Sequence, residues 1–510
     1  MQKLYARVYL TLSAILNPPR RQIIVAILLG GLAVLGYAPF YFYPATILAL
    51  AGLFYLWRNA ASARRMAALG FAFGLGLFGT GVSWIYISLH DFGGMPMLLA
   101  AFATAAFCAF IALFPALAGW VLGKFPPATR HLATPLLWVA QEWVRGWIFT
   151  GFPWLAVGYS QVPYSPLAGF APLFGIYGVS LLTALCATLI AGTFSGQIGK
   201  KQLALWLLGF WLCGATLKHI AWSEPHGVPV RFSLLQGNIA QDLKWREDEL
   251  QHTLQTYQQM VLASHAQLIV LPEMAFPLLL EDLPDGYLDT LTQHARAQGG
   301  DLLVGVPEIQ RDASTSRYYN SMLSYGTAPT QTYRKSHLVP FGEFIPFKPL
   351  IGWIYRELLH IPLADLTSGE RNQPPMALAG QRVAVNICYE DVFGEEIVRP
   401  LPEATLLINA SNDAWYGTSL AAHQHLQMSQ ARALETARMM LRATNTGATA
   451  VIDRDGRVLA EAPHFTLATL DGEAQGYTGT TPYVRWGNIP IISLIFLVLG
   501  VLWRLYRPER

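Results

Sequence analysis

Long apolar runs alternate with short polar segments over the first 221 residues and return near the C-terminus. A helix of about 20 apolar residues crosses the roughly 30 Å hydrocarbon core of a bilayer. We therefore expect about eight membrane-spanning helices, near residues 22–38, 43–57, 67–89, 95–123, 131–149, 167–194, 202–221 and 488–503. The second is short for a bilayer. The fifth contains Glu142 and Arg145, which either lie near an interface or pair with each other.

Residues 222–485 follow a different pattern, in which apolar runs of strand or helix length are separated by polar turns. The spacing predicts helices over 248–264, 287–298 and 421–441. It predicts strands over 228–235, 267–271, 301–306, 321–325, 331–334, 382–387, 405–409, 448–453 and 457–460. Alternating elements of this kind are typical of an α/β domain. The chain thus divides into a transmembrane bundle of about seven spans over 1–221, an α/β domain over 222–485, and a last span with a basic tail over 486–510.

Composition and charge agree with a membrane protein and suggest an orientation. The chain is 53% hydrophobic and only 13% charged, where a soluble domain carries roughly a quarter charged residues. Basic residues gather at the ends of the apolar runs, at positions 20, 21, 58, 64, 65, 124, 130, 200, 201, 504, 507 and 510. The positive-inside rule places these clusters, and both termini, in the cytoplasm, and residues 222–485 outside it. A dispersed net charge of +3 does not favour nucleic acid as a partner.

The cysteines differ in their surroundings. Cys108, Cys186 and Cys213 fall in predicted spans, where a thiol behaves as a small hydrophobe. Cys388 alone lies in the α/β domain, so it has no disulfide partner there. A lone cysteine of this kind is either a buried structural residue or a catalytic nucleophile.

Three polar residues follow apolar strand-like runs: Glu273 after QLIVLP, Lys335 after TYR, and Cys388 after VAVNI. Alone, Glu or Lys after a strand is an ordinary solvated residue, but strand ends are also where α/β folds place their sites. A cysteine becomes a nucleophile when a base removes its proton, and a carboxylate can do this. A lysine ammonium can stabilise the negative charge that develops on a carbonyl oxygen. The three residues are therefore a complete set for acyl transfer, with no metal or cofactor required.

Other polar and apolar groups have competing interpretations. His423 and His425 could suggest a metal, but no further ligand stands at a suitable spacing, so we expect histidines on a helix surface. Arg432, Glu435 and Arg438 are expected to form a salt-bridged face of the same helix. Residues 276–280 and 344–363 are rich in apolar and aromatic groups. They are either loops that face the core or mobile arms that touch lipid, with Phe276, Trp353 and Tyr355 as lipid-contact candidates.

The motifs around the three strand ends resemble those of the nitrilase, or carbon-nitrogen hydrolase, superfamily. They are PE at 272–273, YRKSHL at 333–338 and ICYE at 387–390, in the superfamily's chain order, and the resemblance covers about residues 228–470. It implies an α-β-β-α sandwich in which Glu273 is the general base and acid, Lys335 stabilises the oxyanion, and Cys388 is the nucleophile. The superfamily also uses a second glutamate, which Glu343 in PFGE would supply.

Nearly the whole chain is similar to a membrane-bound branch of that superfamily, the apolipoprotein N-acyltransferases of the bacterial inner membrane. The similarity includes the many spans before the domain, the single span after it, and LQGNIAQDLKW ending at Trp245. It implies a periplasmic domain in which Cys388 takes an acyl chain from a phospholipid as a thioester. The acyl group then passes to the α-amino group of the S-diacylglyceryl cysteine of an apolipoprotein. Tyr389 and Glu390 would adjoin the nucleophile and Trp245 would line the approach, although Tyr389 and Trp245 could equally be packing aromatics.

Two other functions remain to be weighed. A membrane-tethered amidase would use the same three residues on small amides, but it would need neither a bundle nor aromatic arms. A long acyl chain does need an apolar sheath, since each buried methylene contributes about 0.8 kcal/mol. A transporter or scaffold would be expected to show paired repeats and ionisable residues at mid-membrane, and the sequence offers few of either.

Overall fold

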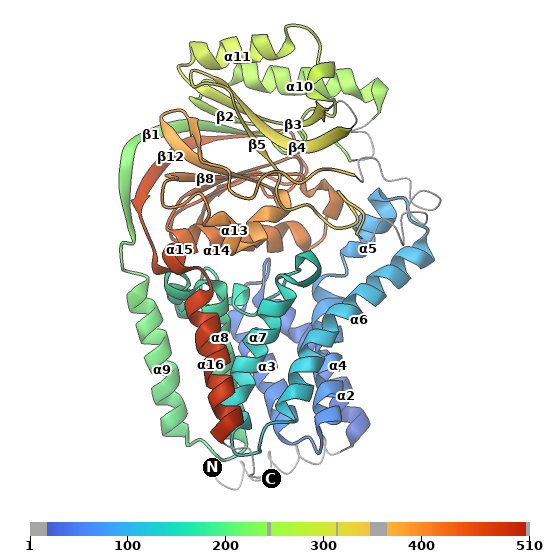
Figure 1. Ribbon diagram of the computed structural model, residues 1–510, viewed down its shortest axis with the longest axis vertical. Helices are drawn as coiled ribbons and strands as arrows, with labels where there is room; N and C mark the ends of the chain where they lie inside the picture. The colour runs from blue at the N-terminus through green and yellow to red at the C-terminus, as the bar shows by residue number, and fades with distance from the viewer. Residues whose placement is uncertain (1–17, 242–245, 313–314, 347–364, 506–510) are drawn as a thin grey trace. The chain divides into compact units, whose positions relative to one another are not determined.

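The computed structural model describes residues 18–241, 246–312, 315–346 and 365–505 (Figure 1). The chain forms two compact units. The first is helical and consists of residues up to 85, residues 101–219 and residues from 488 onward. The second holds the β-sheets and consists of residues 220–487 together with residues 86–100. Trp245, Trp353 and Tyr355, which the sequence suggested as site residues, lie outside the described residues.

Every segment predicted to span a membrane contains a helix within the described residues. These helices are α2 (Pro19–Ala33), α3 (Tyr43–Arg58), α4 (Ala63–Gly81), α6 (Met97–Leu122), α7 (Arg130–Arg145), α8 (Ala171–Phe194), α9 (Lys200–Leu217) and α16 (Ile489–Leu505). Between α4 and α6 the chain forms the short α5 (Ile85–Ile87) and η2 (Ser88–Phe92).

Fewer than eight of the described helices are long and apolar enough by themselves to cross a membrane. Among the described residues, three helical stretches are long and apolar enough to cross a membrane: Pro19–Gly36, Met97–Leu122 and Pro166–Phe194. A fourth counts if Ala63–Gly81 and Ile85–Phe92, which are bent by 57°, form one span. Helices α3 and α7 have 16 residues each, or about 24 Å at 1.5 Å per residue, which is less than the bilayer core. Length and composition therefore support three or four spans rather than eight.

Glu142 and Arg145 on α7 are both buried and both bind the segment that follows the helix. Glu142 accepts hydrogen bonds through Oε1 from Trp138 Nε1 and from the backbone N–H of Val157, each at 2.9 Å. Arg145 donates through Nη1 to the carbonyl oxygens of Phe152 and Trp154, each at 2.6 Å. The two charges thus fasten the chain around residues 152–157 to α7, a role that the sequence left open.

The described part of the second unit contains two six-stranded sheets with matching topology. The first sheet has the order β12 (Ala468–Gly479), β1 (Ser223–Gln236), β2 (Leu268–Val270), β3 (Asp301–Arg311), β4 (Ser316–Gly326) and β5 (Gln331–Arg334). The second has the order β11 (Val458–Glu461), β10 (Ala450–Ile452), β9 (Met440–Thr444), β8 (Leu406–Ser411), β7 (Gln381–Ile387) and β6 (Met376–Leu378). In each sheet three neighbouring strands are parallel, β1–β2–β3 and β7–β8–β9, and the remaining pairs are antiparallel.

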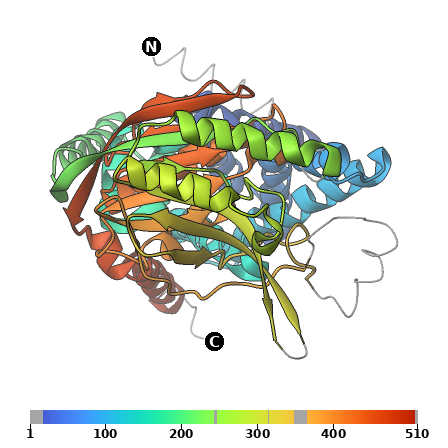
Figure 2. The same cartoon turned by 90° about the horizontal axis from the view of Figure 1, so that it is seen from above.

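Helices cover the outer face of each sheet and apolar side chains fill the space between the sheets. Helices α10 (Glu247–Ala263) and α11 (Tyr287–Ala297) lie side by side over the first sheet (Figures 1 and 2). Helices α13 (Gly394–Ile397) and α14 (Ala421–Thr436) cover the second. Side chains of both sheets form one buried core, which includes Phe232, Leu234, Val385, Ile408 and Leu441. This is the α-β-β-α sandwich that the resemblance implies.

In this unit one expectation from the sequence is wrong, and one of two open alternatives is decided. The helix predicted over 421–441 ends at Thr436, because Ala437 adopts a left-handed conformation with φ 52° and residues 440–444 form β9. Glycine is the usual mark of such an ending, and none is present here. Phe276, a lipid-contact candidate whose alternative was a loop facing the core, is 0% exposed and packs against Tyr257 of α10 and Tyr287 of α11. Its side chain belongs to the domain core.

Candidate active site

Cys388 stands on a strained turn directly after β7. Its φ is 51°, in the left-handed region that residues other than glycine rarely adopt, and it begins a short 3-10 helix, Cys388–Val392. Its carbonyl oxygen accepts a hydrogen bond from Asn409 Nδ2 at 3.1 Å and lies 3.2 Å from Nε2 of His425. Strained backbone of this kind persists where surrounding contacts hold it, and it gathers at functional sites. The surroundings therefore fix the position of the thiol.

Lys335 follows β5 directly and is buried between two carboxylates. Its Nζ lies 2.9 Å from Oε1 of Glu343 and 3.3 Å from Oε1 of Glu273, and the lysine is 1% exposed. Asn320 Nδ2 donates to the same two oxygens, at 2.7 Å to Glu273 and 3.1 Å to Glu343. The structure thus brings Glu343, which the resemblance suggested, into one hydrogen-bonded group with Glu273 and Lys335.

The carboxylate of Glu273 is oriented from two sides. Oε1 accepts from Lys335 and Asn320, while Oε2 accepts from the backbone N–H of Asn412 at 2.9 Å. Asn412 lies just after β8 in the second sheet, whereas Glu273 follows β2 in the first. The N–H of Asn412 therefore ties the carboxylate of one sheet to the sheet that carries Cys388.

The charges of Glu273 and Lys335 act on the pKa of Cys388. Burial raises the pKa of the thiol well above its usual range, and the negative charge of Glu273 raises it further, whereas Lys335 lowers it. Burial lowers the pKa of Lys335, but Glu273 and Glu343 outweigh burial and hold that pKa well above its ordinary value. At neutral pH the resting site thus contains a neutral thiol and a charged ammonium. A base must remove the thiol proton when the nucleophile attacks.

Glu390 joins the Cys388 turn to the segment that carries Lys335. Oε1 accepts from the N–H groups of Ser336 at 2.7 Å and His337 at 3.1 Å, and from Ser336 Oγ. Oε2 accepts from the N–H of Ile387 and from the hydroxyl of Tyr333, each at 2.8 Å. Burial raises the pKa of Glu390, although these backbone hydrogen bonds lower it. Glu390 is therefore a support for the two segments.

Tyr389 packs against other rings. It lies edge-on to Phe393, with ring centroids 5.1 Å apart, and edge-on to His337, at 5.8 Å. The side chain is 6% exposed. This geometry matches the packing alternative for Tyr389.

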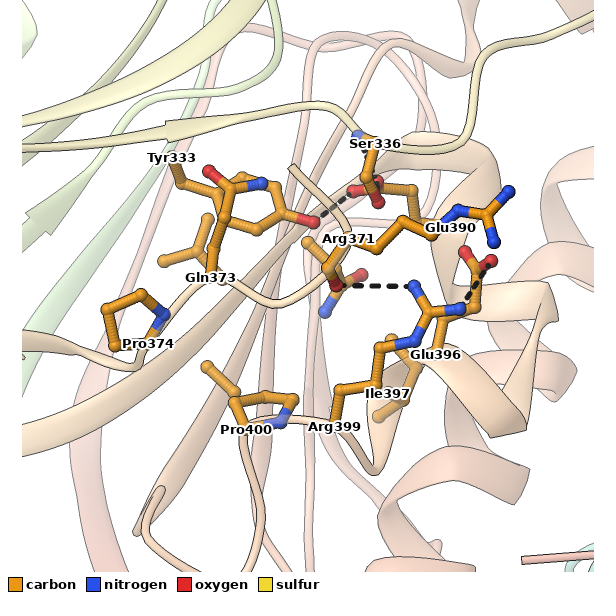
Figure 3. Close-up of a pocket in the computed structure, with 13 residues that line it drawn as sticks. Tyr333, Ser336, Arg371, Gln373, Pro374, Glu390, Glu396, Ile397, Arg399 and Pro400 are labelled. Atoms are coloured by element: carbon orange, nitrogen blue, oxygen red, sulfur yellow. Dashed lines mark hydrogen bonds and ion pairs between the residues drawn. The ribbon is translucent and has the colours of Figure 1, made fainter. Parts of the chain in front are cut away.

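Glu390 also lines a pocket (Figure 3). Its lining residues include Tyr333, Ser336, Glu390 and two arginines, Arg371 and Arg399. Arg399 donates to the carbonyl oxygen of Arg371 and to Glu396 Oε1, each at 3.3 Å. Glu273, Lys335 and Cys388 are not among the residues that line it. This pocket is therefore separate from the reacting groups.

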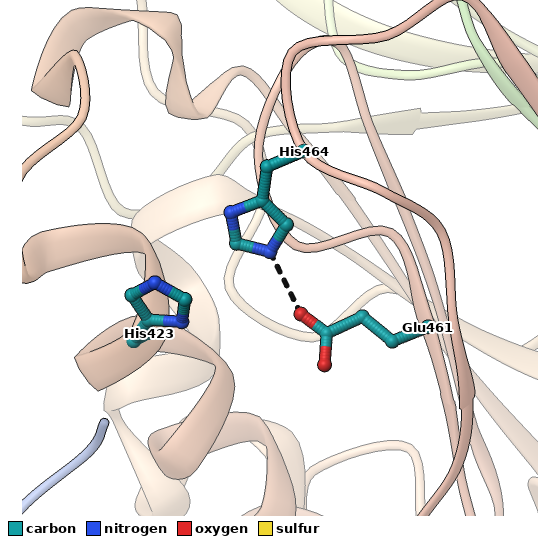
Figure 4. A group of neighbouring side chains, drawn as sticks. All are labelled: His423, Glu461 and His464. Carbon is teal, nitrogen blue, oxygen red and sulfur yellow. Dashed lines mark hydrogen bonds and ion pairs between the residues drawn. The ribbon is translucent and has the colours of Figure 1, made fainter. Parts of the chain in front are cut away.

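The two histidines of α14 point in different directions, which corrects the expectation that both lie on a helix surface. His425 is 0% exposed, and its ring nitrogens lie 2.7 Å from Asp391 Oδ1 and 3.1 Å from Asp413 Oδ1. His423 stacks on His464, with centroids 4.8 Å apart, and His464 Nε2 lies 2.7 Å from Glu461 Oε1 (Figure 4).

The group of His423, Glu461 and His464 has the composition of a metal site, which the sequence spacing had not suggested. One ligand atom from each residue lies within 4.8 Å of the others. The two rings are stacked, with their planes inclined by 22°. The geometry is that of a stacked pair with a hydrogen-bonded carboxylate at its edge.

The predicted salt-bridged face of α14 is only partly correct. Arg432 Nη2 lies 2.9 Å from Glu435 Oε2, but both residues are buried rather than on a surface. Arg438 lies beyond the end of the helix and donates to the carbonyl oxygens of Ala404 and Gly479, each at 2.8 Å. Arg438 therefore supports the backbone instead of joining an ion pair on the helix.

Several residues of the site gave no signal in the sequence. They are Asn320, Asn409, Asn412, Asp391, Asp413 and Arg442, whereas His425 was considered only as a histidine of a helix surface. Asn412 acts through its backbone N–H, so its residue type carries no information about the contact. The charged members of the group become recognisable only when β9, which holds Arg442, is seen beside β8.

Comparisons with known proteins cover both units. Residues 29–189 match the model of the apolipoprotein N-acyltransferase N-terminal domain, and residues 231–483 match that of the carbon-nitrogen hydrolases. An apolipoprotein N-acyltransferase from Nitrosomonas europaea is 53% identical over 94% of this chain and 96% of its own length. One from Chromobacterium violaceum is 44% identical over 94% of each chain. The solved carbon-nitrogen hydrolase of Helicobacter pylori G27 is 16% identical with a TM-score of 0.37, over 54% of this chain and 94% of its own.

The first family model matches the apolar helices, and the second matches the sandwich that follows them in the chain. The curated relatives share that order over nearly their whole length. The chain therefore belongs to the apolipoprotein N-acyltransferase family.

Proposed function

We propose that the chain transfers an acyl group from a phospholipid to the N-terminal amine of an apolipoprotein, through a thioester on Cys388. One observation carries this proposal: Lys335 is buried between the carboxylates of Glu273 and Glu343, beside a buried thiol on a strained turn. A base, a fixed cation and a nucleophile are the groups that acyl transfer requires. The names of the relatives support an apolipoprotein as the acceptor.

In the first step the Sγ atom of Cys388 attacks the ester carbonyl of the phospholipid while Glu273 takes the thiol proton. The ammonium of Lys335 stabilises the oxyanion of the tetrahedral intermediate. The carbon–oxygen bond then breaks, and Glu273 returns the proton to the departing lysophospholipid hydroxyl. The products are an acyl thioester and a lysophospholipid, so atoms and charge balance.

In the second step the α-amino group of an S-diacylglyceryl cysteine attacks the thioester. Glu273 removes a proton from the attacking nitrogen, Lys335 again stabilises the oxyanion, and the thiolate of Cys388 leaves and regains a proton. Glu343 forms a second ion pair with Lys335, and it polarises the attacking group. The acceptor becomes an N-acyl, triacylated cysteine. This ping-pong route needs no metal or cofactor.

The surroundings of the site suit a lipid donor. Phe341 stands two residues before Glu343 and is 48% exposed. In the second unit η2 packs against the 3-10 helix η8 (Asp413–Tyr416), where Ser88 Oγ donates to the carbonyl oxygen of Trp415 at 2.7 Å. An exposed aromatic side chain thus stands close in the chain to Glu343, and an acyl chain would need such apolar shelter from water.

We also propose a location and an orientation. Residues 1–221 and 486–510 would hold the protein in the bacterial inner membrane, in contact with membrane lipids. Basic residues at the ends of the apolar helices favour cytoplasmic termini and a periplasmic catalytic domain over 222–485. Fusing a reporter that is active only in the periplasm after residue 326, in the turn between β4 and β5, should give signal. A reporter fused at the C-terminus should not.

A mass-spectrometric experiment tests the reaction. Purified full-length protein is incubated with phospholipid vesicles, and the peptide that contains Cys388 is analysed for an acyl adduct. The adduct should form, should be absent in Cys388→Ser, and should disappear when a diacylated lipopeptide with a free N-terminus is added. Hydrolysis of a small amide without an acyl adduct from phospholipid would instead indicate a membrane-tethered amidase.

A further inference from the structure

A cluster of four charged side chains lies fully buried behind the Cys388 turn. Asp391, His425 and Arg442 are 0% exposed and Asp413 is 1% exposed. Taking such groups out of water costs several kcal/mol per ion, and apolar side chains often fill the same space at least as well. Stability alone therefore gives no reason for this cluster. Its hydrogen bonds show what it holds in place.

One side of the Arg442 guanidinium acts on the donors that hold Cys388. Nη1 donates to Asn409 Oδ1 at 2.7 Å and to Asp391 Oδ2 at 3.0 Å. Asn409 in turn donates through Nδ2 to the carbonyl oxygen of Cys388. Asp391 holds the ring of His425, whose Nε2 lies 3.2 Å from that same oxygen. Arg442 thus orients both groups that fix the strained turn.

The other side of the guanidinium acts on the donor that holds Glu273. Nη2 donates to Asp413 Oδ1 at 3.2 Å and Oδ2 at 3.0 Å. Asp413 also accepts from Ser411 Oγ at 2.9 Å, so both neighbours of Asn412 are fixed. The N–H of Asn412 is the one that meets Glu273 Oε2 at 2.9 Å. Arg442 therefore sets the direction of that N–H through Asp413.

We propose that Arg442 is a positioning residue that fixes the nucleophile, Cys388, and the general base, Glu273, relative to each other, although they follow strands of different sheets. The roles of Cys388 and Glu273 in this statement rest on the proposed function. A guanidinium suits the task because it presents donors in a rigid plane and can bind Asp391 and Asp413 at once. Lysine keeps the charge but lacks the planar fork. Arg442→Lys should therefore separate charge from geometry.

Alkylation of Cys388 by iodoacetamide tests the proposal without any lipid substrate. The full-length protein is labelled across a pH series, and the rate at the Cys388 peptide is measured by mass spectrometry. Arg442→Lys should slow this rate by at least about 10-fold at neutral pH and displace its pH profile. The matched control is Arg438→Lys, a buried arginine that donates to backbone carbonyls away from the site. The control should lower Tm but leave the alkylation profile unchanged.

A double-mutant cycle gives the decisive comparison. Glu273→Gln removes both the proposed base and the charge that raises the thiol pKa, so it should change the alkylation rate strongly in the wild-type background. The change should be much smaller in the Arg442→Lys background, because Glu273 is already displaced there. If the two effects multiply independently, or if Arg442→Lys changes only Tm, the positioning role is wrong. Should Arg442→Lys fail to fold, Asp413→Asn keeps Arg442 and weakens the Asn412 side together with the contact between Asp413 and His425, and it is judged by the same cycle. Failure of the proposed acyl transfer would appear separately, as a missing acyl adduct in the wild type.

Discussion

The Nζ atom of Lys335 lies 2.9 Å from Oε1 of Glu343, with the lysine side chain only 1% exposed. Glu273 lies 3.3 Å from the same ammonium. One buried ammonium therefore forms ion pairs with two carboxylates. The arrangement makes the charge of Lys335 necessary both for stability and for the proposed chemistry.

Removing that charge should destabilise the sandwich. Lys335→Met leaves two carboxylates without their cation, and breaking a buried ion pair in this way costs about 3–5 kcal/mol. Denaturant unfolding of the variant should show that loss, and acyl transfer should be abolished. Adding Glu343→Gln to Lys335→Met should recover part of the stability and none of the activity. A Lys335→Met protein as stable as the wild type would contradict this account of the site.

Glu273→Gln should test the proposed base while leaving the fold intact. The amide has nearly the same shape but cannot take a proton, so thioester formation should fall by about 10²- to 10⁴-fold. The rate is measured as acyl adduct on the Cys388 peptide after rapid quenching. Glu281→Gln, an exposed residue paired with Arg311, is the control and should be neutral. Equal rates for wild type and Glu273→Gln would exclude Glu273 as the base.

Glu390→Gln tests the support between the Lys335 segment and the Cys388 turn. Both carboxylate oxygens of Glu390 accept hydrogen bonds from donors, so an amide NH₂ group at either position would face a donor and leave it unsatisfied. The expected loss is about 1–3 kcal/mol, measured by denaturant unfolding. Glu403→Gln, an exposed partner of Arg382, should change stability little. An unchanged Glu390→Gln protein would show that the segments are held by other contacts.

The sequence indicated the three candidate catalytic residues but not the residues that support them. Glu273, Lys335 and Cys388 follow β2, β5 and β7, so apolar runs that end in polar residues were visible along the chain. The order of layers in the sandwich also agreed with the resemblance. Short-range patterns are sufficient for such features, because each depends on a few neighbouring residues.

The supports depend on contacts between distant segments. Arg442 lies on β9, one residue beyond the helix predicted over 421–441, so no predicted element contained it. The direction of His425 also could not be read from spacing, since His423 stands two residues earlier on the same helix and faces another way. Fewer helices than predicted have the length of a span for a related reason, since α3 and α7 have 16 residues each.

The cluster behind Cys388 should give the protein a stability maximum between two pH limits. Burial raises the pKa of Asp413, but Arg442 and His425 lower it by more than burial raises it. The folded pKa therefore lies below the ordinary value of about 3.9. The stabilisation from Asp413 is thus present above about pH 3.9 and is lost as pH falls toward the lowered pKa.

The limit at higher pH comes from His425. Burial and Arg442 lower its pKa, but Asp391 and Asp413 raise it more, so the folded pKa lies above about 6.5. Its stabilisation is present below that pH and is lost as pH rises through the raised folded value. Tm measured across pH should therefore fall on both sides. Asp413→Asn should flatten the acid side and His425→Gln the alkaline side, and a variant that leaves its own side unchanged would contradict the assignment.

Two phenylalanines near the site should respond to truncation in opposite ways. Phe276 is 0% exposed in the core, so Phe276→Ala should cost about 3–5 kcal/mol of stability. Phe341 is 48% exposed beside Glu343, so Phe341→Ala should leave stability nearly unchanged. If Phe341 contacts the donor lipid, its truncation should slow acyl transfer from a long-chain phospholipid more than from a short-chain one. The comparison of the two donors within one variant removes any general loss of activity. Equal slowing with both chain lengths, or none with either, would show that Phe341 does not meet the acyl chain.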